Sequence, residues 1–383
     1  MRINSKWEVK KLGEICEVVN GGTPKTNVKE HWNGTNLWIT PAEMGKRETF
    51  FVEKTVRQLS NSGLKNSSAK LLPPYSVILS SRAPIGHLVI NIKPMATNQG
   101  CKGLIPSGKL FYLFLYYYLY FSVDYLINLG TGTTFKELST WKLKEVEIPF
   151  PLLSEQKRIV VKLDKFSENI KRLEDIARKN LQNAKDLFNS VLNEAFKNTS
   201  VIDGRQTYKK THWEVKKLGQ ILTLEYGKPL PDNKRFIEGK YPVYGANGEK
   251  SKTNDFLYDK PSIIIGRKGS AGEINLAENK FWPLDVTYFV TFNNNQYYLS
   301  FLFWLLHSLN LPKLAKGVKP GINRNEVYNV DVCIPDIRKQ KKIAKKLDKL
   351  SAETKKLEIV YQKKIDGLAE LKKSVLKQTF DCG

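Results

Sequence analysis

The chain has 383 residues, of which 41% are hydrophobic and 11% aromatic, so it can form two or three packed domains and is not a disordered chain. Lys and Arg number 62 against 38 Asp and Glu, which gives a formal net charge of +24. Such an excess attracts polyanions, most commonly nucleic acid, and an anionic membrane surface is a second partner that charge alone allows.

Neither the N-terminal region nor the most apolar stretch indicates insertion into a membrane. The segment MRINSKWEVKKLGEI has no apolar core of signal-peptide length. The most apolar stretch, residues 110–123, is shorter than the roughly 18 residues that a membrane span needs, and its tyrosines favour a buried helix. The four cysteines are far apart and form no CxxC pair. We therefore expect a reduced, cytoplasmic protein with no membrane association and no zinc site.

The chain repeats itself. The segment WEVKKLG occurs at residues 7–13 and again at residues 213–219. The segment PLLSEQKRIVVKLDKFSENIKRLE from Pro151 matches PDIRKQKKIAKKLDKLSAETKKLE from Pro335, and the segment between the two repeated ends is shorter in the second half. This pattern indicates one scaffold that carries two different variable inserts.

Each insert is predicted to mix strands and helices. The β-rich runs 76–79 and 262–265 are followed by the turns SRAPIG and GRKGSAG, so we expect Arg82 and Arg267 to occupy equivalent positions. The aromatic segments FYLFLYYYL and YYLSFLFWLL are predicted to be core helices. Further strands, VEIPFP and VDVCIP, lead out of each insert.

A long helix is predicted to close each half. Residues 154–197 contain no Pro or Gly, and their apolar or small residues recur in steps of three and four, with one irregular 4-4 step. The second half repeats this stripe, with its 4-4 step at the same place. Matching irregular steps indicate that the two helices pack against each other. The alternative is an exposed basic coiled coil that joins another chain.

In this order of segments, and above all in the PLLSEQKRI junction and the duplicated architecture, the chain closely resembles the specificity (S) subunit of type I restriction–modification enzymes. The second junction departs from the first, with Lys339 where the first has Glu155. The resemblance implies that each insert is a target-recognition domain for one half of a split DNA sequence. It further implies that the paired helices act as a ruler and as the dock for methyltransferase (M) subunits, with restriction/translocase (R) subunits joining through the complex.

No catalytic chemistry of the chain's own is predicted. Leu72-Pro73-Pro74-Tyr75 resembles the PPY element of amino-methyltransferases, but Leu72 cannot accept a hydrogen bond from a target amine, and no glycine-rich cofactor loop follows a strand. Pro231-Asp232 with Glu278-Asn279-Lys280 is a loose nuclease-like pattern, and Asp232 lies in a turn-like stretch. We expect no cofactor, no catalytic residue and no metal site.

Basic and amide side chains in the polar turns of the inserts are the candidate DNA contacts. Arg suits guanine and Asn or Gln suits adenine, whereas Lys suits phosphate. The candidates in the first insert are Arg82, Lys102, Thr133, Thr134 and Lys136, with Asn98 and Gln99 as amide candidates. Those in the second are Arg267, Lys268, Lys316, Lys319 and Arg324, with Asn247 and Asn323. For each residue, a solvated surface role or a turn-stabilising role is the alternative.

The long helices are the candidate partner-binding elements. Residues 338–380 hold 14 Lys or Arg against 5 Asp or Glu, so one face is expected to stay solvated or to meet an acidic surface. The residues assigned to the spacer helices and their partners are Gln156, Ile159, Leu163, Gln340, Ile343 and Leu347. Gln156 and Gln340 are expected to cap the junction between strand and helix.

The sequence thus predicts an α+β protein with two mixed α/β target-recognition domains in tandem, separated by two long antiparallel coiled-coil helices. The expected boundaries are residues 1–153 and 198–337 for the domains, and 154–197 and 338–383 for the helices. The predicted function is a sequence-specific subunit that binds double-stranded DNA with a bipartite, asymmetric target. The alternative is an architectural or adaptor protein that binds nucleic acid without recognising sequence.

Overall fold

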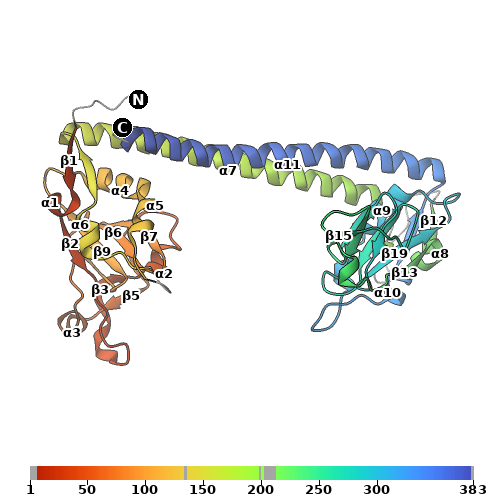
Figure 1. Cartoon of the computed structure of the whole chain (residues 1–383), viewed down its shortest axis with the longest axis horizontal. Coiled ribbons are helices and arrows are strands. Elements are labelled where there is room, and N and C mark those ends of the chain that lie inside the picture. Colours follow the sequence, from red (N-terminus) through yellow and green to blue (C-terminus); the bar gives the residue numbers. More distant parts are fainter. Residues whose placement is uncertain (1–6, 133–135, 198–199, 202–212, 381–383) are drawn as a thin grey trace. The chain divides into compact units, whose positions relative to one another are not determined.

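The structure, a computed structural model, describes residues 7–132, 136–197, 200–201 and 213–380. The chain forms two compact units, one of residues 1–176 with 364–383 and the other of residues 177–363. Each unit mixes helices and sheets, as the sequence predicted (Figure 1). Within the described ranges, no helix is both long enough and apolar enough to cross a bilayer.

The first unit contains three sheets. A two-stranded antiparallel ribbon pairs β1 (Glu8–Lys11) with β10 (Glu147–Phe150). A five-stranded sheet has the order β2-β9-β6-β7-β4, with bounds Cys16–Asn20, Cys101–Pro106, Val77–Ser81, Ile85–Asn91 and Phe51–Val52. A three-stranded sheet has the order β5-β3-β8, with bounds Arg57–Leu59, Trp32–Ile39 and Met95–Thr97. The helices are α1 (Leu12–Ile15), η1 (Lys29–His31), α2 (Pro41–Met44), α3 (Asn61–Lys65), α4 (Tyr112–Phe121), α5 (Val123–Leu129) and α6 (Thr140–Lys144).

The second unit repeats this plan. Its outer sheet has the order β11-β20-β12, with bounds Ser200–Val201, Asp331–Ile334 and Glu214–Lys217. Its central sheet has the order β13-β19-β16-β17, with bounds Leu222–Tyr226, Thr287–Phe292, Ser262–Gly266 and Ile274–Ala277. A third sheet has the order β15-β14-β18, with bounds Gly248–Thr253, Tyr241–Gly245 and Trp282–Pro283. The helices are α8 (Leu218–Ile221), η2 (Asp232–Lys234), α9 (Leu299–Ser308), η3 (Leu311–Leu314) and α10 (Arg324–Tyr328).

The two units differ where the repeated segments differ in length. Between β3 and β6 the first unit carries α2, β4, β5 and α3, whereas the second unit has only the strand β15 between β14 and β16. The four-strand order β2-β9-β6-β7 is matched by β13-β19-β16-β17, and the parallel pair β3–β8 is matched by β14–β18. One scaffold therefore holds two inserts of different size.

The two aromatic segments form core helices, as predicted. Phe114, Leu115 and Leu119 of α4 are fully buried against the central sheet of the first unit. Phe301 and Leu305 of α9 are fully buried in the second unit. Burying such side chains stabilises a fold by roughly 1.5–3 kcal/mol each.

The long helices are α7 (Leu153–Phe196) and α11 (Ile337–Phe380), close to the predicted bounds (Figure 1). In the first unit, Ile159 and Leu163 near the start of α7 share a core with Phe380 at the end of α11. In the second unit, Phe196 at the end of α7 shares a core with Leu347 near the start of α11. Because each core combines the beginning of one helix with the end of the other, the helices are antiparallel, and the predicted fold class is confirmed.

A buried glutamine connects each long helix to the aromatic helix of its unit. Gln156 Oε1 accepts a hydrogen bond from Phe111 N at 2.8 Å, and its Nε2 donates to Lys109 O at 3.1 Å and Pro151 O at 2.8 Å. Gln340 makes the same three bonds, with Tyr298 N, Gln296 O and Pro335 O. The glutamines therefore bond the strand–helix junction, as expected, and in addition the start of the aromatic helix.

Candidate nucleic-acid interface

In the first unit, a basic cluster surrounds the turn after β6. Arg82 Nη1 lies 3.6 Å from Glu137 Oε2, and the backbones of the two residues form an isolated β-bridge. Lys102 lies on the neighbouring strand β9 and is only 7% exposed. Gly100, two residues before Lys102, lies beside Arg82, since a Cβ atom there would be 3.4 Å from Arg82 Cγ. The fold thus brings together Arg82 and Lys102, which are 20 positions apart in the sequence.

Burial and two neighbouring charges shift the pKa of Lys102 in this cluster. Burial lowers the pKa of the Lys102 ammonium group and Arg82 lowers it further, whereas Glu137 raises it. Glu137 therefore partly neutralises two cations that would otherwise repel each other. An anion that displaced Glu137 from Arg82 would meet both positive groups, which is the electrostatic requirement for a phosphate or base-edge contact.

The other first-unit candidates lie around this turn with different exposure. Asn98 Oδ1 accepts a hydrogen bond from Gly100 N at 3.0 Å, which is the turn-stabilising role that was the alternative for it. Gln99 is exposed, and its Oε1 accepts a hydrogen bond from Thr23 Oγ1. Lys136 is exposed beside Glu137, and Thr133 and Thr134 lie outside the described residues.

In the second unit, two arginines lie against one tyrosine ring. The guanidinium carbons of Arg267 and Arg324 are each 5.3 Å from the ring centroid of Tyr226, within cation–π range. Arg267 also donates from Nε and Nη2 to Asp285 O, at 3.1 and 2.8 Å. Tyr226 is 48% exposed, so the arrangement is open to solvent.

The lysines of the second unit come from two turns that are bonded to each other. Gly269 N donates to Pro320 O at 3.1 Å, and Lys316 N donates to Gly321 O at 3.0 Å. Lys268, Lys316 and Lys319 are exposed on these turns, and Lys316 Nζ forms an ion pair with Glu326 at 2.6 Å. Backbone bonds thus hold a group of cations next to the two arginines.

The two amide candidates of the second unit have different roles. Asn323 caps α10, since its Oδ1 accepts from Asn325 N at 2.9 Å. Asn247 is exposed at the tip of the β14–β15 hairpin. That hairpin lies against the Arg267 turn, because a Cβ atom on Gly266 would lie 2.6 Å from Ala246 O.

Hydrogen bonding corrects the expected equivalence of Arg82 and Arg267. Leu138 N donates to Ser81 O at 2.9 Å, and the matching bond of the second unit joins Ile322 N to Arg267 O at 3.0 Å. Arg267 therefore corresponds to Ser81. Arg82, which bridges Glu137, corresponds to Lys268, which bridges Gly321. Aligning the runs 76–79 and 262–265 residue by residue also places Arg82 on Lys268, whereas matching one arginine to the other shifts the comparison by one residue.

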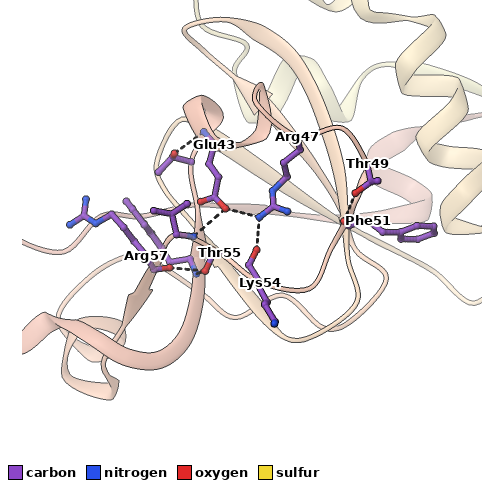
Figure 2. Close-up of polar contacts among 10 residues, drawn as sticks. Glu43, Arg47, Thr49, Phe51, Lys54, Thr55 and Arg57 are labelled. Atoms are coloured by element: carbon purple, nitrogen blue, oxygen red, sulfur yellow. Dashed lines mark hydrogen bonds and ion pairs between the residues drawn. The ribbon is translucent and has the colours of Figure 1, made fainter. Parts of the chain in front are cut away.

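A second basic surface in the first unit was missed by sequence reasoning. Glu43 Oε1 accepts from Arg47 Nη2 at 2.6 Å and from Val56 N at 3.2 Å, and Arg47 also donates to Lys54 O (Figure 2). Beside this network the Arg57 guanidinium lies 3.6 Å from the ring centroid of Trp32. The residues that line the adjacent hollow of about 380 Å³ are Trp38, Thr40, Ala42, Glu43, Lys46, Arg47, Val56 and Arg57. No repeat carries these residues, and the sequence signal was four basic residues, Lys46, Arg47, Lys54 and Arg57, that follow two tryptophans.

Comparison with known proteins gives the family. Residues 4–181 and 210–365 match the family model of the type I restriction modification DNA specificity domain. The chain is 31% identical over 369 residues to the type I restriction enzyme MjaIX specificity subunit of Methanocaldococcus jannaschii, covering 87% of this chain and 84% of that one. The chain belongs to the type I restriction–modification DNA specificity family. As in the family, it is a specificity subunit with two recognition domains, and the family does not favour an adaptor without sequence recognition.

Other specificity-family relatives extend the match. The type I restriction enzyme EcoprrI specificity subunit of Escherichia coli is 25% identical over 364 residues, covering 90% of this chain and 87% of that one. Two solved structures share the fold across 99% of this chain and 98% of theirs. One belongs to work on complex assembly and conformational transition of the type I R-M system, with a TM-score of 0.80 and 18% identity. The other is the HsdS subunit from Thermoanaerobacter tengcongensis, with a TM-score of 0.60 and 16% identity.

The six residues assigned to the spacer helices of this specificity subunit lie inside the chain. Gln156 is fully buried, and Ile343 is half-buried. The other four are at most 5% exposed: Ile159, Leu163, Gln340 and Leu347. The two glutamines hydrogen-bond the junctions and the four apolar residues pack in the cores, so we expect a surface for partners to consist mainly of other side chains of α7 and α11.

The residues of the two loose catalytic patterns lie in turns or at the ends of strands. Asp232 is an exposed residue of η2 whose carboxylate lies 3.2 Å from Arg235 Nη1, and Glu278 follows β17. Asn91 Nδ2 donates to Pro73 O at 2.8 Å, which holds the Pro-Pro-Tyr segment as a turn. Among the described residues, no group of three or more His, Cys, Asp or Glu side chains could hold a metal ion.

Proposed function

We propose that this chain recognises a bipartite, asymmetric target in double-stranded DNA, and that each unit recognises one half of it. The observation that carries the proposal is the pair of basic clusters at equivalent turns. One contains Arg82 and Lys102 with Glu137, and the other contains Arg267 and Arg324 against Tyr226. Equivalent placement with different side chains is what two different half-sites require.

Within each cluster, different residue types suit contact with different parts of the DNA. Arg82, Arg267 and Arg324 suit bidentate contact with guanine, and the exposed amides of Gln99 and Asn247 suit adenine. Exposed lysines such as Lys268 and Lys319 suit phosphates, which fix position and supply affinity without recognising sequence. Salt should therefore weaken the binding of all DNA, whereas loss of an arginine should change which DNA is preferred.

The long helices are proposed to fix the length of the spacer, the unrecognised DNA between the two half-sites. They are also proposed to dock methyltransferase subunits, through which restriction/translocase subunits join. The basic composition of α11 supports this, as does the burial of Leu347, Thr354 and Ile365 in its apolar stripe, since most of its lysines are exposed. The domains are proposed to be residues 1–153 and 198–337, with helices 154–197 and 338–383 between and after them. The chain itself is proposed to be a non-catalytic cytoplasmic subunit without a cofactor.

A genome-wide methylation map with this gene intact and deleted tests the proposal. Loss of methylation at one split, asymmetric motif is expected on deletion. If a methyltransferase partner is co-expressed and the map is the same with and without the chain, the specificity-subunit proposal fails and the adaptor alternative gains.

A pair of arginine variants tests the assignment of residues. Arg267→Ala is expected to relax base preference in one half of the motif. Arg235→Ala is the matched control, because Arg235 also donates from Nε and Nη2 to one backbone carbonyl, Leu230 O, but lies outside the cluster. Unchanged base preference in Arg267→Ala would remove this residue from the interface.

A further inference from the structure

Two scaffold positions touch each other in both units. The first is the last residue of β2 and of β13. Asn20 pairs with Lys102 of β9, and Tyr226 pairs with Tyr288 of β19. The next residues make the same bond, Gly21 N to Cys101 O and Gly227 N to Thr287 O, each at 3.2 Å. Asn20 and Tyr226 therefore occupy one position of the scaffold.

The second position is the first residue of α6 and of α10, where Thr140 and Arg324 stand. Thr140 Oγ1 donates to Asn20 Oδ1 at 2.6 Å. Arg324 instead lies 5.3 Å from the Tyr226 ring centroid. The same two positions are thus in contact in both units, with an amide and a hydroxyl in one and a ring and a guanidinium in the other.

We propose that these positions determine specificity, and that Tyr226 is a positioning residue that holds Arg267 and Arg324 for guanine in the second half-site. This inference rests on the proposed function of sequence-specific DNA recognition. In the first unit, Asn20 and Thr140 occupy the corresponding positions, so that half-site is recognised by neutral hydrogen-bonding groups at this point.

The surroundings of Tyr226 hold the two arginines in place. Tyr288, beneath it, is 3% exposed, its ring centroid lies 5.1 Å from that of Tyr226, and its hydroxyl donates to Ile322 O at 3.3 Å. Two of the five Arg267 N–H donors bond Asp285 O, which leaves three. Among the residues that the structure describes, Arg324 forms no ion pair.

A guanidinium held in this way suits guanine. Arg presents a planar fork that matches the O6 and N7 acceptors, and a fork fixed beforehand loses less conformational entropy on binding. A phosphate contact would need the charge but not the fixed orientation. Removing the ring should therefore change base preference more than it changes overall affinity.

The test uses the full chain with its methyltransferase partner in a cell, followed by a methylation map of each variant. Tyr226→Leu removes the ring face, and we expect it to reduce the preference for guanine at one half-site by about tenfold. Tyr226→Phe keeps the ring and should keep the preference. Recognition of the other half-site in the same molecules shows that the variant chain is folded.

Phe256→Leu is the matched control, because Phe256 is another exposed ring of the second unit with a cation, Lys280, 4.5 Å from its centroid. It should leave the motif unchanged. Asn20→Ala changes the equivalent position of the first unit. It should reduce base preference only in the half-site whose recognition Tyr226→Leu leaves unchanged.

Three outcomes would contradict the inference. If Tyr226→Leu keeps the wild-type motif, or lowers methylation equally at all sequences, Tyr226 does not position base-recognising groups, and the proposed function still stands. If the half-site relaxed by Arg267→Ala contains only A·T pairs, guanine is not the ligand. If the wild-type chain directs no methylation at a split motif, the proposed function fails and this inference fails with it.

Discussion

At the scale of single residues, one glutamine that repeats between the halves satisfies buried backbone groups in both units. Gln156 and Gln340 each make three hydrogen bonds and are 0% and 1% exposed. No shorter or apolar side chain could replace both the donor and the acceptor. Leaving a buried backbone polar group without a partner costs about 1–3 kcal/mol.

Gln156→Leu should therefore destabilise the chain by roughly 2–5 kcal/mol, since three buried backbone groups lose their partner at once. Urea unfolding of the full chain measures this. Gln182→Leu, on the exposed side of the same helix, is the control and should stay within about 0.5 kcal/mol of wild type. A Gln156→Leu chain as stable as its control would mean that water or another side chain satisfies the junction.

Some residue-scale features leave no trace in the sequence repeat. Trp38 on β3 donates from its indole to Gly22 O at 2.9 Å, whereas Trp282 on β18 donates to Lys228 O at 3.0 Å. The two carbonyls are equivalent, but the indoles come from neighbouring strands. The sequence analysis predicted neither of these two strands, and which of two adjacent strands supplies a given contact depends on register.

At the scale of elements, each aromatic helix is fixed to its long helix by an aspartate. Tyr117 OH donates to Asp164 Oδ1 at 2.5 Å, and Trp304 Nε1 donates to Asp348 Oδ1 at 2.7 Å. Ser300 Oγ adds a second bond to Asp348 at 2.6 Å. The repeated KLDK segment is thus explained by this attachment.

Asp348→Ala should loosen α9 from α11, at a cost of about 1.5–3 kcal/mol for hydrogen bonds to a charged acceptor. Hydrogen exchange measures this locally. Faster exchange is expected in α9, with α4 of the first unit unchanged, and Asp164→Ala should give the reverse pattern. Equal acceleration in both aromatic helices would show that the two units do not open independently.

His307 makes the α9–α11 contact sensitive to pH. Burial lowers the pKa of His307 below its ordinary value of 6.5, and Lys355 lowers it further. On acidification the unfolded chain therefore binds the proton at a higher pH than the folded chain does. The contribution of neutral His307 to the free energy of unfolding is fully present above pH 6.5 and is lost as the pH falls from 6.5 toward the folded pKa.

His307→Gln should remove that part of the loss of stability on acidification. Unfolding free energy measured from pH 7.5 to 5 tests this, with His87→Gln of the first unit as the control for removing a histidine. If both variants lose stability in parallel with the wild type below pH 6.5, other groups cause the acid sensitivity.

At the scale of the whole molecule, the sequence predicted the architecture because the duplication and the helical stripe are long-range patterns that tolerate local error. Of the proposed interface, only part was predicted from the sequence. The turns carry the predicted cations. Tyr226 and Asn20, which end strands, and Thr140, which begins a helix, were not selected, because their proposed role depends on the segment packed beside them. Polar composition marks a turn, whereas contact between two distant turns follows only from the fold.

The length of the long helices is proposed to determine the distance between the two half-sites. If α7 and α11 set the unread spacer, removing one heptad from each keeps the apolar stripe in phase. It also shortens each helix by about 10 Å at 1.5 Å per residue, which corresponds to roughly 3 base pairs of DNA. A methylation map of this paired deletion should show both half-sites unchanged and the spacer shorter by that amount. Removing the heptad from α7 alone should abolish methylation, because the cores that combine both helices no longer align. An unaltered spacer in the paired deletion would mean that the distance between half-sites is fixed by the partner subunits, and the helices would then be left with the docking role alone.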